Sequence, residues 1–147
     1  MSNWHLMEKR KSVSQKRDAD FVKLISLKYL NAPEIAGGKN PFGISPQGLV
    51  QMVFKIAGWP LPGDIQLQSN FGKKVKDLLQ KTKLGDLAFF KDKKGSVDHV
   101  GIVLDENKII HASGHVRVDY LNEEGILNSE TKIYSHTLSH IRRVIGS

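Results

Sequence analysis

The hydrophobic pattern of this chain changes its period once, and this change limits the fold more than any other feature. Apolar residues recur at helical spacing over residues 18–31 and again over residues 46–58. From residue 86 they form short runs rich in β-branched and aromatic residues, at 86–90, 99–104, 108–112, 116–120 and 139–145. Two of the gaps between these runs have the length of a hairpin turn. Helices followed by antiparallel strands predict the α+β class.

Local signals mark where the second helix begins and ends. Ser45 is a residue type that caps a helix N-terminus, and Pro46 suits the first helical position, where a missing N–H does no harm. Gly58 is a typical C-terminal stop. The apolar side of this helix predicts that it lies at the centre of the core. A further short helical region is expected around residues 65–80.

The chain has 147 residues, which predicts a single domain over residues 18–147, preceded by a flexible polar arm over residues 1–17. No run of apolar residues approaches the roughly 20 that cross a bilayer, so no membrane span is expected. The charged N-terminus is not a secretory signal peptide. As it stands the chain would be cytoplasmic, whereas removal of a leader would imply the periplasm or the cell envelope.

Composition excludes several kinds of site. The sequence has no cysteine, which excludes a thiol nucleophile, a zinc-thiolate cluster and an iron–sulfur site. The net charge of +7 favours anionic partners. However, the basic residues fall in separate groups without interleaved aromatic residues, so specific nucleic-acid binding is not expected. No cofactor is predicted.

Two histidines lie on neighbouring strands of the predicted sheet. His99 opens one apolar run and His111 lies inside the next, so a hairpin places their side chains side by side. If the start of the second helix packs against the same face, Pro46 converges with both. A nucleophile at a helix N-terminus, activated by a histidine that a further polar group orients, is the arrangement of cysteine peptidases.

Five short motifs resemble those of the NlpC/P60 cell-wall peptidases in order and spacing. They are Gly43-Ile44-Ser45-Pro46-Gln47-Gly48-Leu49-Val50-Gln51, Leu61-Pro62-Gly63-Asp64, Gly85-Asp86-Leu87-Ala88-Phe89-Phe90, His99-Val100-Gly101-Ile102-Val103 and Ile110-His111-Ala112-Ser113-Gly114. The resemblance covers about residues 18–145 and implies a papain-like fold, with N-terminal helices packed on an antiparallel β-sheet. It also implies cleavage of the γ-D-glutamyl to diamino-acid bond of peptidoglycan stems, and it is strongest for the dipeptidyl-peptidase branch.

The chain departs from the family where the reaction would occur. The resemblance places Pro46 at the position of the nucleophilic cysteine, Ser45 at that of the preceding aspartate and Gln47 at that of the following serine. It assigns His99 as the general base and His111 as the residue that orients it. Proline has no atom that can attack a carbonyl, yet its fixed φ suits the first turn of a helix. The three catalytic positions, Pro46, His99 and His111, are therefore predicted to be vestigial.

The resemblance also supplies candidates for substrate binding, which are Ser45, Gln47, Asp64, Glu34 and Ser113. Glu34 stands where the family has a tyrosine that lines the site. Asp64 matches an acidic residue that helps to hold the free amine of the substrate, although a helix N-cap is the simpler explanation for it. Ser113 belongs to the last of the five motifs. Glu34 and Gln47 either line an open cleft or fill it.

These observations favour a catalytically inactive NlpC/P60-like domain that acts as a binding or assembly module. A peptidoglycan stem peptide or a protein partner is the expected ligand, and the basic surface would neutralise the carboxylates of such a peptide. One alternative is an active peptidase that uses Ser45, or a water molecule activated by His99, in place of the cysteine. Another is a structural subunit of a larger complex.

The histidines allow two further groupings. A metal site could be drawn from His99, His111 and His115, or from His136 and His140. No carboxylate cluster lies beside either set in the sequence, so no metal site is predicted.

Overall fold

The computed structural model describes residues 15–76 and 81–146, so most of the predicted polar arm, residues 1–14, lies outside the described residues. The helices are α2 (Ala19–Leu27), α3 (Pro46–Ile56) and α4 (Ile65–Gln68). The strands are β1 (Lys39–Asn40), β2 (Gly43–Ile44), β3 (Lys73–Lys74), β4 (Leu87–Lys91), β5 (Val97–Val103), β6 (Lys108–Ser113), β7 (His115–Leu121), β8 (Gly125–Leu127) and β9 (Tyr134–Arg143). Helices precede the main sheet, as the change of period predicts.

Side-chain caps set the beginnings of the helices. Asp18 accepts a hydrogen bond from the backbone of α2, and Ser45 accepts one from the backbone of α3. Pro46 occupies the first position of α3, as predicted. The helix expected around residues 65–80 is much shorter, because Gly72 adopts a φ of +75° and the chain then enters β3. Residues 77–80 lie outside the described part of this region.

The sheet closes on itself, which corrects the expected arrangement of helices packed on an open sheet. Its strand order is β3-β9-β4-β5-β6-β7-β8, and a further pairing joins β8 to β9. Strand β9 makes this closure because its first residues pair with β8 and its later residues with β4. The result is a small antiparallel barrel with few helices. The edge of β8 is paired with β9 and is not left open.

Both faces of the central strands are buried, which explains why their sequences are continuously apolar. Phe89 and Ile110 belong to a core that includes residues of α2 and α3. Their neighbours Phe90 and Ile109 belong to a second core inside the barrel. Successive residues of a strand point to opposite faces, so alternate side chains of each strand belong to the two different cores.

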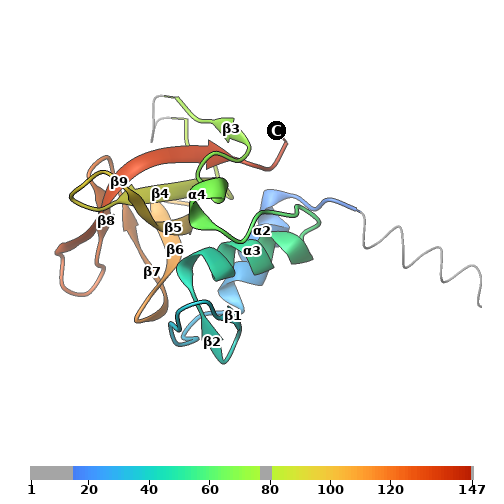
Figure 1. Ribbon diagram of the computed structural model, residues 1–147, viewed down its shortest axis with the longest axis horizontal. Helices are drawn as coiled ribbons and strands as arrows, with labels where there is room; N and C mark the ends of the chain where they lie inside the picture. Colours follow the sequence, from blue (N-terminus) through green and yellow to red (C-terminus); the bar gives the residue numbers. More distant parts are fainter. Residues whose placement is uncertain (1–14, 77–80, 147) are drawn as a thin grey trace, which may run out of the picture.

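Helices α2 and α3 lie together against one side of the barrel, with the β1–β2 hairpin beyond the start of α3 (Figure 1). Helix α3 packs on β5 and β6, the two strands that carry the predicted histidines. Within residues 15–76 and 81–146, no helix is long and apolar enough to cross a membrane.

Candidate functional site

A cleft of about 370 Å³ separates the start of α3 from strands β5 and β9. Its lining residues come from the segment after α2, the beginning of α3 and these two strands, and they are Glu34, Ala36, Gly37, Ser45, Pro46, Gln47, Asp98, His99 and His136. Pro46 and His99 thus face the same space, as the sequence predicts. Glu34 and Gln47 line an open cleft and do not fill it.

The Ser45 hydroxyl is committed to the backbone around the helix start. Its Oγ accepts a hydrogen bond from the Gly48 N–H at 3.0 Å and donates to the Gly38 carbonyl at 3.3 Å. Ser45 is only 3% exposed. A Cβ on Gly48 would stand 2.2 Å from the Gly38 carbonyl oxygen, so a glycine is required at this close approach. These contacts hold the first turn of α3 against the loop before it.

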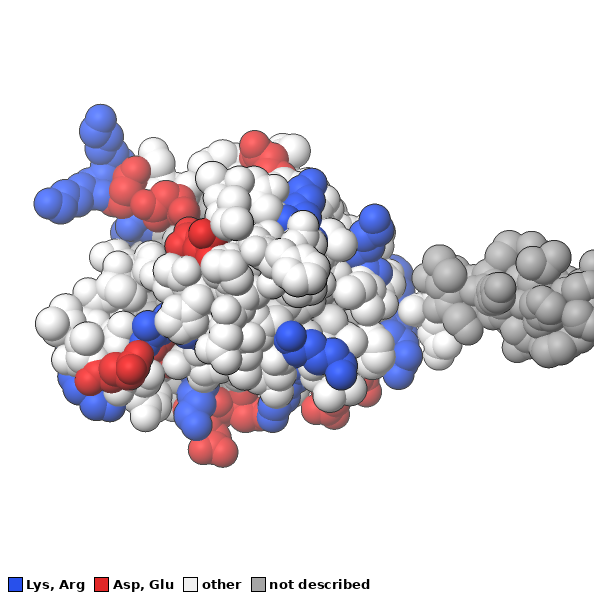
Figure 2. Space-filling view, turned by 90° about the horizontal axis from the view of Figure 1, so that it is seen from below, with Lys and Arg blue, Asp and Glu red and all other residues white. Residues whose placement is uncertain are grey.

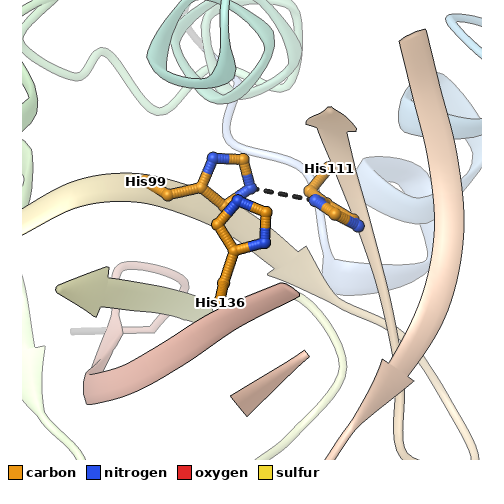
Figure 3. Close-up of side chains that lie close together, drawn as sticks. All are labelled: His99, His111 and His136. Carbon is orange, nitrogen blue, oxygen red and sulfur yellow. Dashed lines mark hydrogen bonds between the residues drawn. The ribbon is translucent and has the colours of Figure 1, made fainter. Parts of the chain in front are cut away.

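His99, His111 and Asp119 form a buried chain of hydrogen bonds. The His99 Nε2 lies 2.9 Å from the His111 Nδ1, and the His111 Nε2 lies 2.7 Å from an Asp119 carboxylate oxygen (Figure 3 shows the two rings). His99 is 5% exposed, His111 is fully buried and Asp119 is 2% exposed. The side-chain pair expected on neighbouring strands is therefore present, with a carboxylate behind it.

The direction of each hydrogen bond follows from the carboxylate. Burial acts to raise the pKa of Asp119, but hydrogen bonds from His111, Ser129 and Arg117 outweigh it and hold the pKa below its usual value. An ionised carboxylate only accepts, so the His111 Nε2 carries the hydrogen, and in the neutral form of this ring Nδ1 accepts. The His99 Nε2 then donates to His111, which leaves the His99 Nδ1 as a lone-pair nitrogen.

A third imidazole, that of His136 on β9, stacks on the His99 ring. The two ring centroids lie 3.9 Å apart with an angle of 19° between the planes (Figure 3). The His136 Nδ1 lies 2.8 Å from the Ser135 Oγ. Burial and the neighbouring His111 lower the pKa of His136 to about 4, and burial lowers the pKa of His99 well below its usual value. Both rings are therefore neutral at pH 7.

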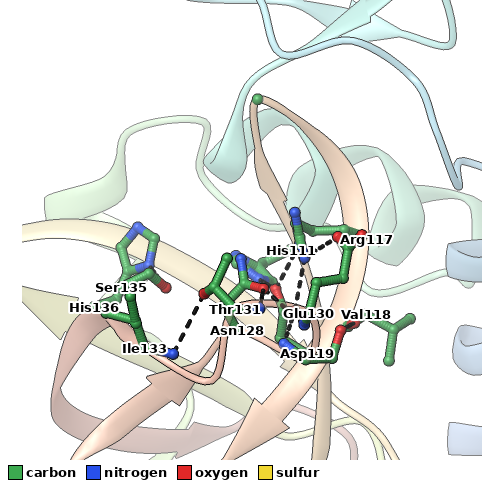
Figure 4. A network of polar contacts seen from close by, with 12 residues as sticks. His111, Arg117, Val118, Asp119, Asn128, Glu130, Thr131, Ile133, Ser135 and His136 are labelled. Atoms are coloured by element: carbon green, nitrogen blue, oxygen red, sulfur yellow. Dashed lines mark hydrogen bonds and ion pairs between the residues drawn. The ribbon is translucent and has the colours of Figure 1, made fainter.

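The polar contacts continue from Asp119 into the loop before β9 (Figure 4). Arg117 donates to Asp119 through Nε at 2.8 Å and through Nη2 at 3.1 Å, and to Glu130 at 2.9 Å. The Ser129 N–H donates to the same carboxylate at 2.8 Å. Asp119 thus holds both the His111 ring and the loop before β9 in place.

The cleft itself carries carboxylates, although the whole chain is basic. Its charged lining residues are Glu34 and Asp98, and no lysine or arginine of residues 15–76 and 81–146 lines it. Glu34 accepts a hydrogen bond from the Gly114 N–H at 2.7 Å. Partial burial and the nearby Asp92 raise the pKa of Asp98. On the face seen in Figure 2, basic and acidic side chains are interspersed and form no continuous basic surface.

Two of the predicted binding residues lie outside the cleft lining. Asp64 accepts hydrogen bonds from the backbones of Gln66 and Leu67 at the start of α4, which is the cap that its sequence position also suggested. Ser113 ends β6 beside the turn to β7 and pairs with His115. Their role in binding a substrate stays a prediction.

Neither grouping of histidines drawn from the sequence occurs as such among the described residues. The group that the fold assembles combines His99 and His111 with His136, and its ring nitrogens lie within 4.8 Å of one another. His140 points elsewhere: it stacks on Phe89 and bonds to the Ser69 carbonyl. A bulge in β9 causes this, because it shifts the register between the partners of Phe89 and Phe90.

Sequence reasoning missed Asp119, and it grouped His136 with His140 and not with His99 and His111. The segment Tyr134–Thr137 is polar, so it carries no strand signal in the sequence. Asp119 had a detectable signal, because it stands two residues from Arg117 on a predicted strand and so shares its face. The β6–β7 hairpin brings Asp119 to His111, whereas His136 reaches the group only because β9 closes the barrel.

A model of the NlpC/P60 family matches residues 35–135. The chain is 33% identical over 100 residues to the γ-D-glutamyl-L-lysine dipeptidyl-peptidase of Bacillus subtilis, a match that covers 67% of this chain and 33% of that relative. The chain thus spans about a third of that relative's length. The crystal structure of an NlpC/P60 family protein from Bacillus cereus superposes with a TM-score of 0.74 at 26% identity, covering 90% of this chain and 42% of that one. RipD from Mycobacterium tuberculosis has the same fold, with a TM-score of 0.66 at 22% identity over 89% of this chain and 100% of RipD.

Proposed function

This chain belongs to the NlpC/P60 family, and from that premise we propose that it is a non-catalytic member that binds a peptidoglycan stem peptide in the cleft beside Pro46. Relatives of the domain include peptidoglycan hydrolases, such as SagA. RipD is a precedent for the loss of catalysis, since it is a non-catalytic NlpC/p60 domain protein adapted to peptidoglycan binding.

The proposal depends above all on Pro46. This residue stands at the family's cysteine position and lines the cleft opposite His99, but its ring offers no nucleophilic atom. Loss of the nucleophile of a catalytic triad costs on the order of 10⁶ in turnover. Ser45 does not replace it, because the Ser45 hydroxyl bonds to the backbone of Gly48 and Gly38.

The charges of the cleft suit one part of a stem peptide in particular. Glu34 and Asp98 place carboxylates at the cleft, so an amino group of the peptide finds opposite charge there. The net charge of +7 attracts the peptide's own carboxylates at longer range. The sequence-based hypothesis likewise had the basic surface neutralise the carboxylates of the peptide, but it gave the free amine to Asp64.

The test is to titrate the full chain with a stem tripeptide or tetrapeptide by calorimetry and to analyse the same mixture by mass spectrometry. We expect saturable binding and an intact γ-linkage. Glu34→Gln keeps an oxygen for the Gly114 N–H but removes the charge, so it should weaken binding several-fold. Glu106→Gln, in the exposed turn between β5 and β6, is the matched control and should leave binding unchanged.

Two outcomes would contradict the proposal. The first is cleavage of the γ-linkage with a turnover above about 1 s⁻¹, the low end for ordinary enzymes. The second is the absence of saturable binding of either peptide.

A further inference from the structure

His99, His111 and His136 come from three strands and meet at one end of the barrel interior. His111 lies two residues after Ile109, and His136 two residues before Leu138; both apolar residues belong to the core inside the barrel. One ring nitrogen from each of His99, His111 and His136 lies within 4.8 Å of the others. We propose that these three residues form a binding site for one divalent transition-metal ion, with zinc as the best match to three imidazole ligands.

In two of the three rings, one nitrogen already has a polar partner outside the group. Asp119 accepts from the His111 Nε2–H, which leaves Nδ1 free to bind an ion. The His136 Nδ1 lies within hydrogen-bond distance of the Ser135 Oγ, and in the tautomer in which Nδ1–H donates to that oxygen, Nε2 is left for the same purpose. Metal-binding histidines usually bond through their other nitrogen to such a polar partner, which fixes the ring and its tautomer. No cluster of carboxylates lies beside these histidines along the chain, but the fold places the carboxylate of Asp119 behind His111.

The third ring must exchange one hydrogen between its own nitrogens. In the structure the His99 Nε2–H donates to His111, so this hydrogen has to move to the His99 Nδ1 before Nε2 can bind an ion. A thiol at position 46 would compete for that Nδ1 as its base, whereas Pro46 makes no such demand.

The three histidine nitrogens can reach the spacing of a zinc site by movement of their side chains alone. Imidazole nitrogens lie about 2.0–2.1 Å from zinc, so two of them on a tetrahedral ion are about 3.4 Å apart. The His99 and His111 nitrogens are 2.9 Å apart, and His136 must turn out of its stack on His99. His99 and His136 line the cleft, so the fourth position of the ion faces the space where the peptide is proposed to bind. A water molecule or a ligand carboxylate fits there.

The experiment uses the full chain without a histidine tag, stripped with a chelator and titrated with Co²⁺, followed by competition with Zn²⁺ against a metal-binding dye. We expect one Co²⁺ per chain, with the visible absorption of a low-coordinate site, and displacement by one Zn²⁺. His136→Gln should weaken the affinity for Zn²⁺ at least tenfold. His140→Gln, a second partly buried histidine of β9 outside the group, should bind like the unchanged chain.

Thermal unfolding checks that each variant is folded, and His99→Asn serves as a second variant if His136→Gln is not. The proposal fails if no stoichiometric binding occurs, if both cleft variants bind as tightly as the unchanged chain, or if His140→Gln weakens binding equally. The stem-peptide experiment run in excess chelator is independent of this site. Failure of either proposal can therefore be recognised separately.

Discussion

The start of α3 and the histidine strands opposite it are held in place by different means. Local contacts fix the helix start: Ser45 caps it, and Pro46 sets the backbone of its first turn. Long-range contacts fix the histidines, since His99, His111 and Asp119 come from three strands and bond in one buried chain. The first region presents a proline ring to the cleft, whereas the second brings the rings of His99 and His136 to it.

This difference shows which parts of the domain tolerate change. A helix N-terminus accepts several residue types, because only a cap and a compatible φ are needed there. A buried polar network tolerates the loss of a member poorly, because the remaining partners stay buried without hydrogen bonds. We therefore expect substitutions in the network to be far more destabilising than substitutions at the helix start.

The largest effect is expected for Asp119→Ala. It removes the acceptor of His111, Arg117 and Ser129 at a site that is 2% exposed, and we expect a loss of about 3 kcal/mol in the free energy of unfolding. Denaturant unfolding measures it. Asp105→Ala, which breaks the exposed ion pair with Lys23, is the control and should cost less than about 1 kcal/mol. Equal losses in the two variants would show that the buried network tolerates the loss of a member as well as an exposed ion pair does.

The next effect concerns reactivity. The triple variant Ser45→Asp, Pro46→Cys and Gln47→Ser introduces the residues that the resemblance to the family implies, and it places a thiol at a helix N-terminus on the cleft that His99 also lines. Because this setting lowers a thiol pKa, an alkylating probe at neutral pH should label it roughly tenfold faster than an exposed thiol from Lys39→Cys. Adding His99→Gln should remove most of the gain. Labelling no faster than the control would contradict the geometry of the cleft.

A smaller effect is expected for the cap itself. Ser45→Ala leaves the Gly48 N–H without its acceptor and should lower the free energy of unfolding by about 1 kcal/mol. Ser45→Asp retains a capping oxygen and should recover most of this loss. Thermal unfolding of the two variants gives the comparison, and a Ser45→Asp variant as unstable as Ser45→Ala would show that capping is not the role of this side chain.

The smallest effect is expected for Pro46→Ala. The unfolded chain gains conformational freedom, so stability should fall by about 0.5 kcal/mol. Binding of the stem peptide should be unchanged, since Pro46 supplies no polar atom to the cleft. A loss of several kcal/mol would mean that the ring packs as a core residue and that the helix start is as intolerant as the histidine network.

Much of the fold could be predicted from the sequence, because its signals are local. Ser45 and Pro46 specify where α3 begins, and the hairpin between β6 and β7 turns at Gly114, which adopts a φ of +75°. The short strand Gly125–Leu127 and the polar start of β9 carry no such signal. Their pairing with each other closes the barrel, and it was therefore not predicted.

The sequence by itself determined the order of helices and strands, the likeness to NlpC/P60 domains and the proline at the helix start. Each of these depends on residues that are neighbours along the chain. Only the tertiary structure decided that the sheet closes, that the cleft is open and acidic, and that His136 and Asp119 join His99 and His111. Such contacts join segments far apart in the chain, and hydrophobic periodicity does not record which polar strand end meets which buried side chain.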